Sequence, residues 1–534
     1  MSKTSWLTQK AAKRDAAYEA YLALYHAGLV NDNLIPLHAV KGRDEADPAA
    51  STTRGGLIKA SERHNPWIDI AFLLESGAPL FRTEIIFEPN FLDLTDMVLL
   101  LPRRLPCEWT FTMYWDEENS FLVRLRPTED VEKEAKFEDA ATLTWMMLRS
   151  TFPQRIPKEK CNPVSLFWPK TRPSDLPPDE WLESMKGHTF AREVITEDCD
   201  FLKLGLARSV ERFSRLFIPE RIIYQEPTER DKQDMDEEEL KQPTIPFVHG
   251  STLPRRSDFL HPIVPNVSQP TPPPKTKAVA LRRCIINKLP AIYSRYSIVI
   301  PSIAHQVDML LFADRLNRTV LADVNFSDLR LLLTAVSASS AQGLTNYQRM
   351  EFLGDSLLKT SAAIHLVARH PLWHEGLLSV AKDKLVSNER LTRVALNLGL
   401  DRYILTRPFT GNKWRPSYVP DLIAAKVSQG TRDLSSKVLA DVIEALLAAA
   451  YLDGGQEKLL RCLRTFLPNV PWSPLEEEVE RLSQHGNSPG ADIPTPILED
   501  IEGLLDYHFR QPELLLEALT HPCCGDKNSM SYQR

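Results

Sequence analysis

The chain has 534 residues, of which 43% are apolar and 25% are charged. This is an ordinary globular composition and gives enough length for three or four domains with buried cores. The formal net charge of −7 argues against a protein that binds nucleic acid through overall positive charge, although local basic patches or metal ions can still bind phosphate.

Several localisation and motor signals are absent from the sequence. The first residues contain no apolar signal segment, no apolar run reaches 18 residues, and no phosphate-binding GxxxxGK[ST] loop occurs. We therefore expect no signal peptide, no membrane span and no nucleotide motor within this sequence. The seven cysteines are scattered and odd in number, and none forms a CxxC pair, which argues against a zinc site or a disulfide framework. An intracellular location, in the cytoplasm or the nucleus, is expected.

The first predicted element is an amphipathic helix over residues 9–28. Apolar side chains recur there at helical spacing, and Gly28 is a plausible stop. The residues of its apolar face are Ala17, Tyr21, Leu24 and Tyr25. This pattern predicts a helix that packs against other parts of the protein.

Residues 80–127 change to the two-residue period of β-strands. Strands are predicted over 82–87, 96–101, 108–115 and 120–127, with a hairpin turn at Asp116–Asn119 and a helix near 136–151. In the third strand an apolar stripe alternates with polar residues, and it consists of Trp109, Phe111, Met113 and Trp115. We expect this stripe to lie in the core, and stacking on RNA bases is the alternative.

The sequence also predicts two linkers and two helical regions. Residues 225–280 contain the acidic run Asp234–Glu239 and the proline-rich run Pro270–Pro274, a composition that does not bury enough surface to fold alone. Residues 286–465 are predicted to be helical throughout. A second linker runs from Pro471 to Pro496, and a helical pattern resumes over 499–522.

An internal repeat connects the two helical regions. The segment FSDLRLLLTAVS (326–337) resembles FRQPELLLEALT (509–520) without gaps. With two extra residues in the second copy, NYQR (346–349) then aligns with SYQR (531–534). The recurrence predicts a duplicated domain, of which the second copy stops at Arg534.

Acidic pairs on two predicted helices are the candidate chemical site. On the helix that starts near 347, Glu351 and Asp355 are four residues apart and share one face. Like charges at this spacing destabilise a helix slightly, and the interior Gly354 costs about 1 kcal/mol relative to alanine. On a second helix, over 435–455, Asp441 and Glu444 share a face among apolar residues, so their carboxylates are predicted to be buried.

If these two helices pack with the acidic faces together, four carboxylates converge. At about 5 Å and an effective dielectric constant of about 20, each close pair repels by roughly 3 kcal/mol, which requires protonation or a bound cation. Oxygen-only ligands favour Mg²⁺ or Mn²⁺, and a pair of such ions suits hydrolysis of a phosphodiester. The alternative is that Glu351 and Asp355 are solvated while Asp441 and Glu444 pair with Lys or Arg.

Three segments in order resemble the ribonuclease III family. They are QRMEFLGDS (348–356), KLVSNERL (384–391) and KVLADVIEALLA (437–448). The resemblance implies an all-α endonuclease domain in which Glu351, Asp355, Asp441 and Glu444 are catalytic metal ligands for Mg²⁺ or Mn²⁺.

Three further residues are predicted to support this site. Lys437 lies one turn before Asp441 and either contacts the scissile phosphate or forms a structural ion pair. Asn388 is expected to cap or brace the site. Gln348 replaces the glutamate of the commonest bacterial form and is not needed for the four carboxylates.

The rest of the chain resembles fungal Dicer-like proteins, most clearly over 300–455. The implied fold class is α+β and multidomain, with a β-rich platform-like unit, an all-α ribonuclease III domain and the start of a second one. The predicted boundaries are 1–40 for the end of a Dicer dimerisation-like fold, 41–224 for the platform-like region, 225–285 for a linker that could include a degenerate PAZ region, 286–468 for the first ribonuclease III domain, 469–498 for a linker and 499–534 for the truncated second domain.

The resemblance implies cleavage of double-stranded RNA in small-RNA silencing or antiviral defence. The implied partners are double-stranded RNA and a second ribonuclease III domain, normally in the same chain, and no membrane. Because the second copy ends at Arg534, we expect the chain to be an interior portion of a longer enzyme or a truncated version. A non-catalytic RNA-binding or dimerisation subunit is the alternative, and a helical scaffold with acidic pairs on its surface is a third hypothesis.

Overall fold

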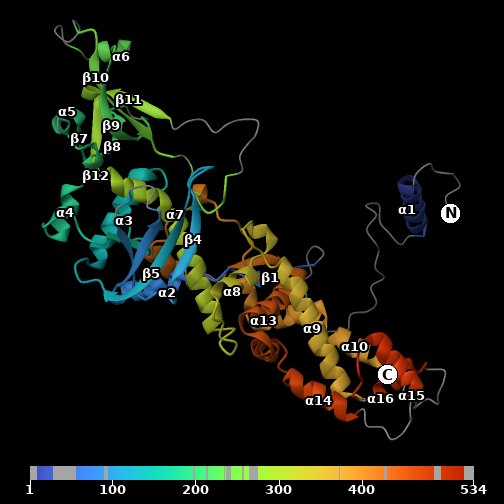
Figure 1. Ribbon diagram of the computed structural model, residues 1–534. Coiled ribbons are helices and arrows are strands. Elements are labelled where there is room, and N and C mark those ends of the chain that lie inside the picture. The colour runs from blue at the N-terminus through green and yellow to red at the C-terminus, as the bar shows by residue number, and fades with distance from the viewer. Residues whose placement is uncertain are drawn as a thin grey trace. The chain divides into compact units, whose positions relative to one another are not determined.

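The computed structural model describes residues 9–27, 56–89, 94, 96–196, 199–211, 214–233, 235, 242–254, 256, 258–263, 275–371, 373–425, 430–485, 495–510 and 512–521. These belong to two units, Met1–Gly55 and Gly56–Arg534 (Figure 1). In the first unit, α1 spans Gln9–His26, which confirms the predicted helix. Tyr21 and Leu24 of its predicted apolar face are exposed, and Gly28 lies outside the described residues.

The second unit contains a five-stranded antiparallel sheet, with strand order β4-β5-β2-β3-β6. Its strands are β2 (Phe81–Glu88), β3 (Met97–Leu101), β4 (Trp109–Tyr114), β5 (Ser120–Val131) and β6 (Leu166–Pro169). The four predicted strands are therefore confirmed, as is the following helix α3 (Phe137–Thr151).

The turn and the apolar stripe of this sheet also follow the sequence prediction. The Asp116 Oδ1 atom accepts the backbone N–H groups of Glu118 and Asn119, at 2.9 and 2.7 Å, which closes the predicted hairpin. In β4, Trp109 and Met113 are buried in the large hydrophobic core. The stripe is thus core.

A second, six-stranded sheet follows, in the order β11-β10-β9-β8-β12-β7. Its strands are β7 (His188–Phe190), β8 (Gly205–Ser209), β9 (Phe217–Gln225), β10 (Ile245–Thr252), β11 (Thr276–Ala280) and β12 (Cys284–Pro290). Three short helices accompany it or lead into it, namely α4 (Pro178–Ser184), α5 (Ala191–Val194) and α6 (Glu229–Lys232). The sheet buries a small core of its own that includes Ala207, Phe217 and Val248.

The prediction of a linker over 225–285 is therefore wrong for the strand segments within that range, while the alternative of a degenerate PAZ region stays a prediction. The strands β10 and β11 lie inside it and pair with each other, and β10 also pairs with β9. The acidic and proline-rich runs that suggested a linker fall in the connections before and after β10, and most of their residues lie outside the described residues. Short strands between long polar connections dilute the apolar pattern, so composition alone missed them.

Helix α7 (Ala291–Arg318) connects the sheets to the helical domain, following β12 directly. Its side chains belong to the same hydrophobic core as the five-stranded sheet and the helices after it. Among the described residues it is the one helix long and apolar enough to cross a membrane, and 78% of its most apolar window is buried inside the protein.

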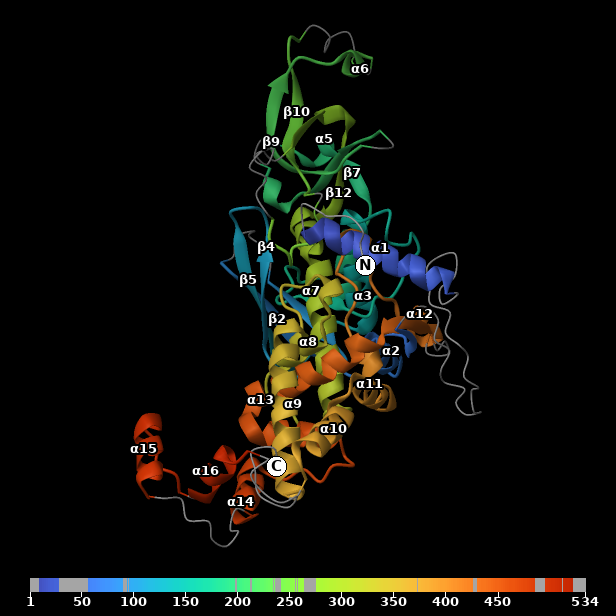
Figure 2. The same ribbon diagram turned by 90° about the vertical axis from the view of Figure 1, so that its right-hand side faces the viewer.

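The helical domain contains α8 (Leu329–Val336), α9 (Gln348–Arg369), α10 (Glu375–Val386), α11 (Asn388–Asn397), α12 (Val419–Ala425) and α13 (Ser436–Phe466). Helices α9 and α13 lie side by side (Figures 1 and 2). The prediction of helix throughout is wrong at β13 (Thr431–Ser435), which pairs antiparallel with β1 (Leu57–Ser61).

This strand pairing also corrects a predicted domain boundary. Helix α2 (Trp67–Glu75) follows β1 and packs against α12, so residues 57–75 belong with the helical domain and not with the platform-like region. The pairing joins residues more than 350 positions apart in the sequence and is not visible in local periodicity.

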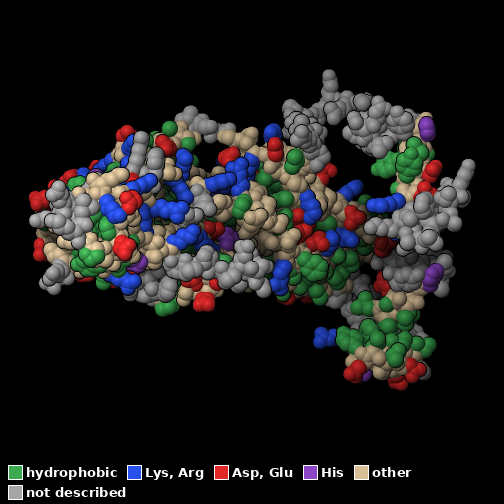
Figure 3. Space-filling view, turned by 90° about the horizontal axis from the view of Figure 1, so that it is seen from above, with side chains coloured by type: hydrophobic (Ala, Val, Ile, Leu, Met, Phe, Trp, Pro, Cys, Tyr) green, Lys and Arg blue, Asp and Glu red, His purple; other side chains and the backbone are tan. Residues whose placement is uncertain are grey.

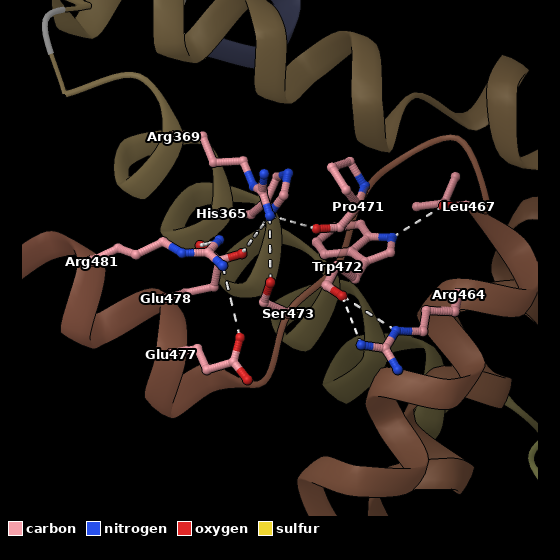
Figure 4. Close-up of polar contacts among 10 residues, drawn as sticks. All are labelled: His365, Arg369, Arg464, Leu467, Pro471, Trp472, Ser473, Glu477, Glu478 and Arg481. Atoms are coloured by element: carbon pink, nitrogen blue, oxygen red, sulfur yellow. Dashed lines mark hydrogen bonds and ion pairs between the residues drawn. The ribbon is translucent and has the colours of Figure 1, made fainter.

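The second predicted linker contains a docked helix, α14 (Leu475–His485), which packs against α9 (Figure 4). Its Glu478 is 3% exposed, and one carboxylate oxygen accepts a hydrogen bond from the His365 ring at 3.1 Å. Arg369 and Arg481 lie 3.7 and 3.4 Å from the same carboxylate. The linker prediction is wrong for residues 475–485, because a buried ion-pair network holds a segment that lacks an apolar run.

Removing this buried carboxylate is expected to undock α14. The Glu478→Ala variant leaves His365 and two arginines without their shared acceptor, which typically costs about 3 kcal/mol. Backbone amides of α14 should then exchange hydrogen about 100-fold faster, because each 1.4 kcal/mol is a factor of ten. Glu477→Ala is the matched control, since the Glu477 side chain is 57% exposed. Equal exchange rates in the two variants would show that Glu478 does not hold the helix.

In the two repeat segments, the helices begin and end at corresponding residues. Under the gapless match, α8 (Leu329–Val336) aligns residue for residue with α16 (Pro512–Leu519). In both copies the phenylalanine before that helix donates its backbone N–H to a side chain of the preceding helix. Phe326 binds Asn317 of α7 at 2.8 Å, and Phe509 binds Glu502 of α15 (Thr495–Leu505) at 2.7 Å. These contacts support a duplication, although the second Tyr-Gln-Arg at 532–534 lies outside the described residues.

Candidate active site

Close packing of α9 on α13 depends on Gly354. A Cβ atom at this position would lie 1.7 Å from the backbone carbonyl oxygen of Glu444. Any larger residue would force the helices apart, so the local cost of an interior glycine is offset by the contact that it allows.

Three of the four predicted carboxylates converge across this contact. Ligand oxygens of Glu351, Asp441 and Glu444 all lie within 4.8 Å of one another. Asp441 and Glu444 are 4% and 7% exposed, which confirms that α13 buries them. The hypothesis of a scaffold with its acidic pairs on the surface is therefore contradicted.

The fourth carboxylate, Asp355, lies at the margin of this cluster. One of its oxygens accepts a hydrogen bond from Lys359 of the same helix at 2.7 Å, and its side chain is 35% exposed. Its charge still reaches the cluster, since it helps to raise the pKa of Glu444. Asp355 is therefore not among the three residues whose ligand oxygens lie within 4.8 Å of one another.

The electrostatics of the cluster show unbalanced negative charge. Burial, followed by the charges of Asp355, Asp441 and Glu351, raises the pKa of Glu444 to about 7. Lys437 donates to both oxygens of Asp441 at 2.8 Å and to Glu351 at 3.2 Å, and these hydrogen bonds raise the pKa of Lys437 above its usual range. One ammonium thus interacts with two carboxylates, while Glu444 is only partly ionised near neutral pH.

The predicted supporting residues have different outcomes. For Lys437 the structure shows the ion-pair alternative, while contact with a phosphate stays a prediction. Asn388 is exposed at the first position of α11, and the side chain that caps this helix is Ser387, whose hydroxyl accepts the N–H of Arg390. The expectation that Asn388 caps or braces the site stays a prediction. Gln348 is exposed at the start of α9.

Sequence reasoning missed Tyr347. This buried residue precedes α9, and its hydroxyl donates to Asp441 at 3.2 Å. Burial and the nearby Asp441 charge raise the pKa of Tyr347 to about 12, so the phenol remains a donor. Its position four residues before Glu351 was the available signal, because that spacing puts both on one helical face.

The donor set fits a hard divalent cation. It consists only of carboxylate oxygens, two of its three residues are buried, and burial together with the neighbouring charges raises the pKa of Glu444 to about 7. Such a group ionises readily when a cation balances the charge. Oxygen donors of this kind are typical for Mg²⁺ and Mn²⁺.

The helices, the glycine contact and the acidic cluster together define a ribonuclease III domain, and the family model described as "Ribonuclease III domain" matches residues 348–455. A second model, "Dicer dimerisation domain", matches residues 1–41. The chain is 38% identical over 99% of its length to Dicer-like protein 2 of Coccidioides immitis and 34% identical over 99% to Dicer-like protein 2 of Phaeosphaeria nodorum. The chain is thus homologous over almost its whole length to part of the fungal Dicer-like proteins, and it contains a ribonuclease III domain.

The matches define how much of such a protein the chain represents. It spans 37% of the length of each of these two relatives. Among solved structures, the Dicer of Giardia intestinalis is similar at a TM-score of 0.38 and 16% identity, covering 73% of this chain and 57% of that chain. A likeness of that size carries no conclusion about the site.

Proposed function

We propose that this chain is the part of a Dicer-like endoribonuclease that cleaves double-stranded RNA by metal-dependent hydrolysis. The convergence of Glu351, Asp441 and Glu444, with Asp355 beside them, carries the proposal. Mg²⁺ or Mn²⁺ is the proposed cofactor. The proposed setting is RNA silencing or antiviral defence inside the cell, in the cytoplasm or the nucleus.

The chain's own residues have distinct tasks in this proposal. A bound divalent cation supplies an activated water and stabilises the leaving oxygen. Glu351, Asp441 and Glu444 hold it, and Tyr347 orients Asp441 through its hydroxyl. Lys437 now pairs with Glu351 and Asp441, and it would be available to a phosphate oxygen if a cation balanced the charge of these carboxylates.

Pairing with a second ribonuclease III domain is part of the proposal. The site on α9 and α13 cuts one strand, so a duplex needs a second site. Phe352, next to Glu351 on α9, is 79% exposed, and a large exposed aromatic beside a reactive site is typical of a surface that packs against a partner. The partner is either the domain begun by α15 and α16 or another chain.

Metal removal tests the proposed function. Purified chain should cut a long RNA duplex in Mg²⁺, stop in excess EDTA, and recover when Mn²⁺ is restored. Cleavage that continues in EDTA would contradict a metal-dependent mechanism. Duplex binding without cleavage at any metal concentration would instead favour the non-catalytic RNA-binding alternative for this portion of the protein.

Metal affinity is expected to depend on pH through Glu444. Because its pKa is raised to about 7, Glu444 holds a proton below that pH, and the cation must displace it. Mn²⁺ affinity should rise by up to about tenfold per pH unit below about pH 7 and level off above it. Calorimetric titrations at about pH 6.5 in two buffers of different ionisation enthalpy should detect proton release. An affinity that is flat across this range, with no released proton, would show that Glu444 does not take part.

A further inference from the structure

A cavity of about 830 Å³ lies apart from the carboxylate cluster, within the second unit. Its walls come from residues 62–67, the middle of α7, the residues around α8 and the loop 405–417. None of the four predicted metal ligands lines it. The cavity therefore has to be explained separately from the proposed active site.

Positive charge dominates the lining of this cavity. Two carboxylates line it, Glu62 and Asp308, against five cations, which are Arg63, Arg407, Lys413, Arg415 and Arg432. Arg63 binds Asp308 at 2.8 Å. Arg432 donates hydrogen bonds to the backbone carbonyl oxygens of Asp401, at 2.6 Å, and of Ile404, at 2.9 Å. The other three cations of the lining are Arg407, Lys413 and Arg415.

Arg407, Lys413 and Arg415 are exposed and form no ion pair with any residue that the structure describes. They lie within nine residues of one loop, so their charges repel one another. Although the formal net charge is −7, Lys and Arg side chains gather in groups on the face seen in Figure 3. Local excess charge of this kind attracts anions whatever the net charge of the chain.

The loop that carries these cations is fixed at both ends. Leu405 exchanges backbone hydrogen bonds with Val336 and Ala338, both at 2.9 Å. At the other end, Ser417 accepts the N–H of Val164 at 3.0 Å. Between them, Arg155 donates to the carbonyl oxygen of Gly411 at 3.0 Å. The helical domain and the segment before β6 thus hold three like charges in place, which is unfavourable without an anion.

Aromatic rings complete the lining. Phe409 of the same loop stacks on His305 of α7, with ring centroids 4.4 Å apart. Burial lowers the pKa of His305 to about 4, so this ring is neutral and adds no charge. Trp67 and Trp414 also line the cavity. Cations with flat rings between them are the features by which proteins hold unpaired nucleotides.

We propose that this cavity binds a short unpaired stretch of an RNA strand, with its phosphates on Arg407, Lys413 and Arg415. The cavity volume falls within the range of small-ligand sites, roughly 300–1,000 Å³, which accommodates a nucleotide or two and excludes a duplex. The inference rests on the proposed function for the identity of the ligand. The cavity would be a second RNA contact. It lies at the boundary between the helical domain and the segment before β6, and it is separate from the site of cleavage.

The test compares two triple variants of the whole chain. The cavity variant is Arg407→Gln, Lys413→Gln and Arg415→Gln. The control is Lys133→Gln, Lys186→Gln and Lys203→Gln, which removes the same charge from exposed side chains outside the cavity. Affinities are measured in EDTA for a blunt RNA duplex, for the same duplex with a single-stranded overhang, and for adenosine monophosphate. Thermal unfolding confirms that both variants are folded.

The cavity variant should bind the overhang duplex about 10- to 100-fold more weakly, while the control and the blunt duplex change little. The dependence of log affinity on log salt should weaken by about two, because three phosphate contacts are lost. Equal losses in both triple variants, or equal losses for blunt and overhang duplexes, would overturn the cavity site. If adenosine monophosphate binds as tightly as the overhang duplex, the ligand of the cavity is a free nucleotide and not an RNA strand. That result would overturn the proposal. Since cleavage is not measured, failure of the proposed catalysis is seen separately, in the Mg²⁺ digestion.

Discussion

Replacing Asp441 with asparagine is expected to lower the rate of duplex RNA cleavage by about 10³-fold or more, which corresponds to about 4 kcal/mol of transition-state stabilisation. Asp441 is the carboxylate that Tyr347 and Lys437 both contact, and it is 4% exposed, so no solvent-exposed group can replace its charge. Asparagine preserves its shape but removes one anionic ligand. Single-turnover cleavage at saturating Mg²⁺ is the measurement.

Glu389→Gln is the matched control for this substitution. Glu389 lies on α11 with its side chain 84% exposed and pairs only with Arg393 of the same helix among the described residues. Its loss should leave the cleavage rate within about twofold, since exposed pairs contribute little. If both variants cleave at the wild-type rate, the carboxylate cluster does not carry the reaction. Near-UV circular dichroism should show that the Asp441 variant keeps its fold.

Replacing Gly354 with alanine is expected to destabilise the helical domain by about 3 kcal/mol or more. The added methyl group would lie 1.7 Å from the Glu444 carbonyl oxygen and 2.5 Å from its carbonyl carbon, both of which are backbone atoms that have no rotamer to adopt. Helices α9 and α13 would have to separate, which also separates Glu351 from Asp441 and Glu444. Denaturant unfolding measures the loss of stability, and Mn²⁺ titration measures the loss of the site.

Gly503→Ala is the control for the glycine effect. Gly503 lies inside α15, and a Cβ atom there meets nothing within 4 Å. Alanine should therefore be neutral or stabilise its helix by up to about 1 kcal/mol. A Gly354→Ala variant that unfolds at the same denaturant concentration as wild type would show that the two helices are not in the close contact that the site requires.

Features with a local period were predictable from the sequence. The alternation in β4 and the spacing of Glu351, Asp355, Asp441 and Glu444 follow directly from strand and helix geometry. Asp355 is the exception within the site, because its contact with Lys359 depends on a side-chain rotamer and not on helical spacing.

Features that depend on distant partners were missed. The pairing of β13 with β1 joins two short segments without apolar runs. The docking of α14 depends on one buried carboxylate, Glu478, whose neighbours come from α9. Polar composition suggested a linker for the α14 segment, because burial of a charged group is decided by the residues that neutralise it and not by its own segment.

Diffraction from crystals of the chain soaked in Mn²⁺ tests the central claim most directly. We expect an anomalous peak bounded by carboxylate oxygens of Glu351, Asp441 and Glu444, at roughly 2.0–2.2 Å from each, with Lys437 released from Asp441. Asp355 should turn from Lys359 toward the ion or its water ligands. Absence of a peak at this position, with Lys437 still bound to Asp441 at saturating Mn²⁺, would contradict a metal-dependent cleavage site on α9 and α13.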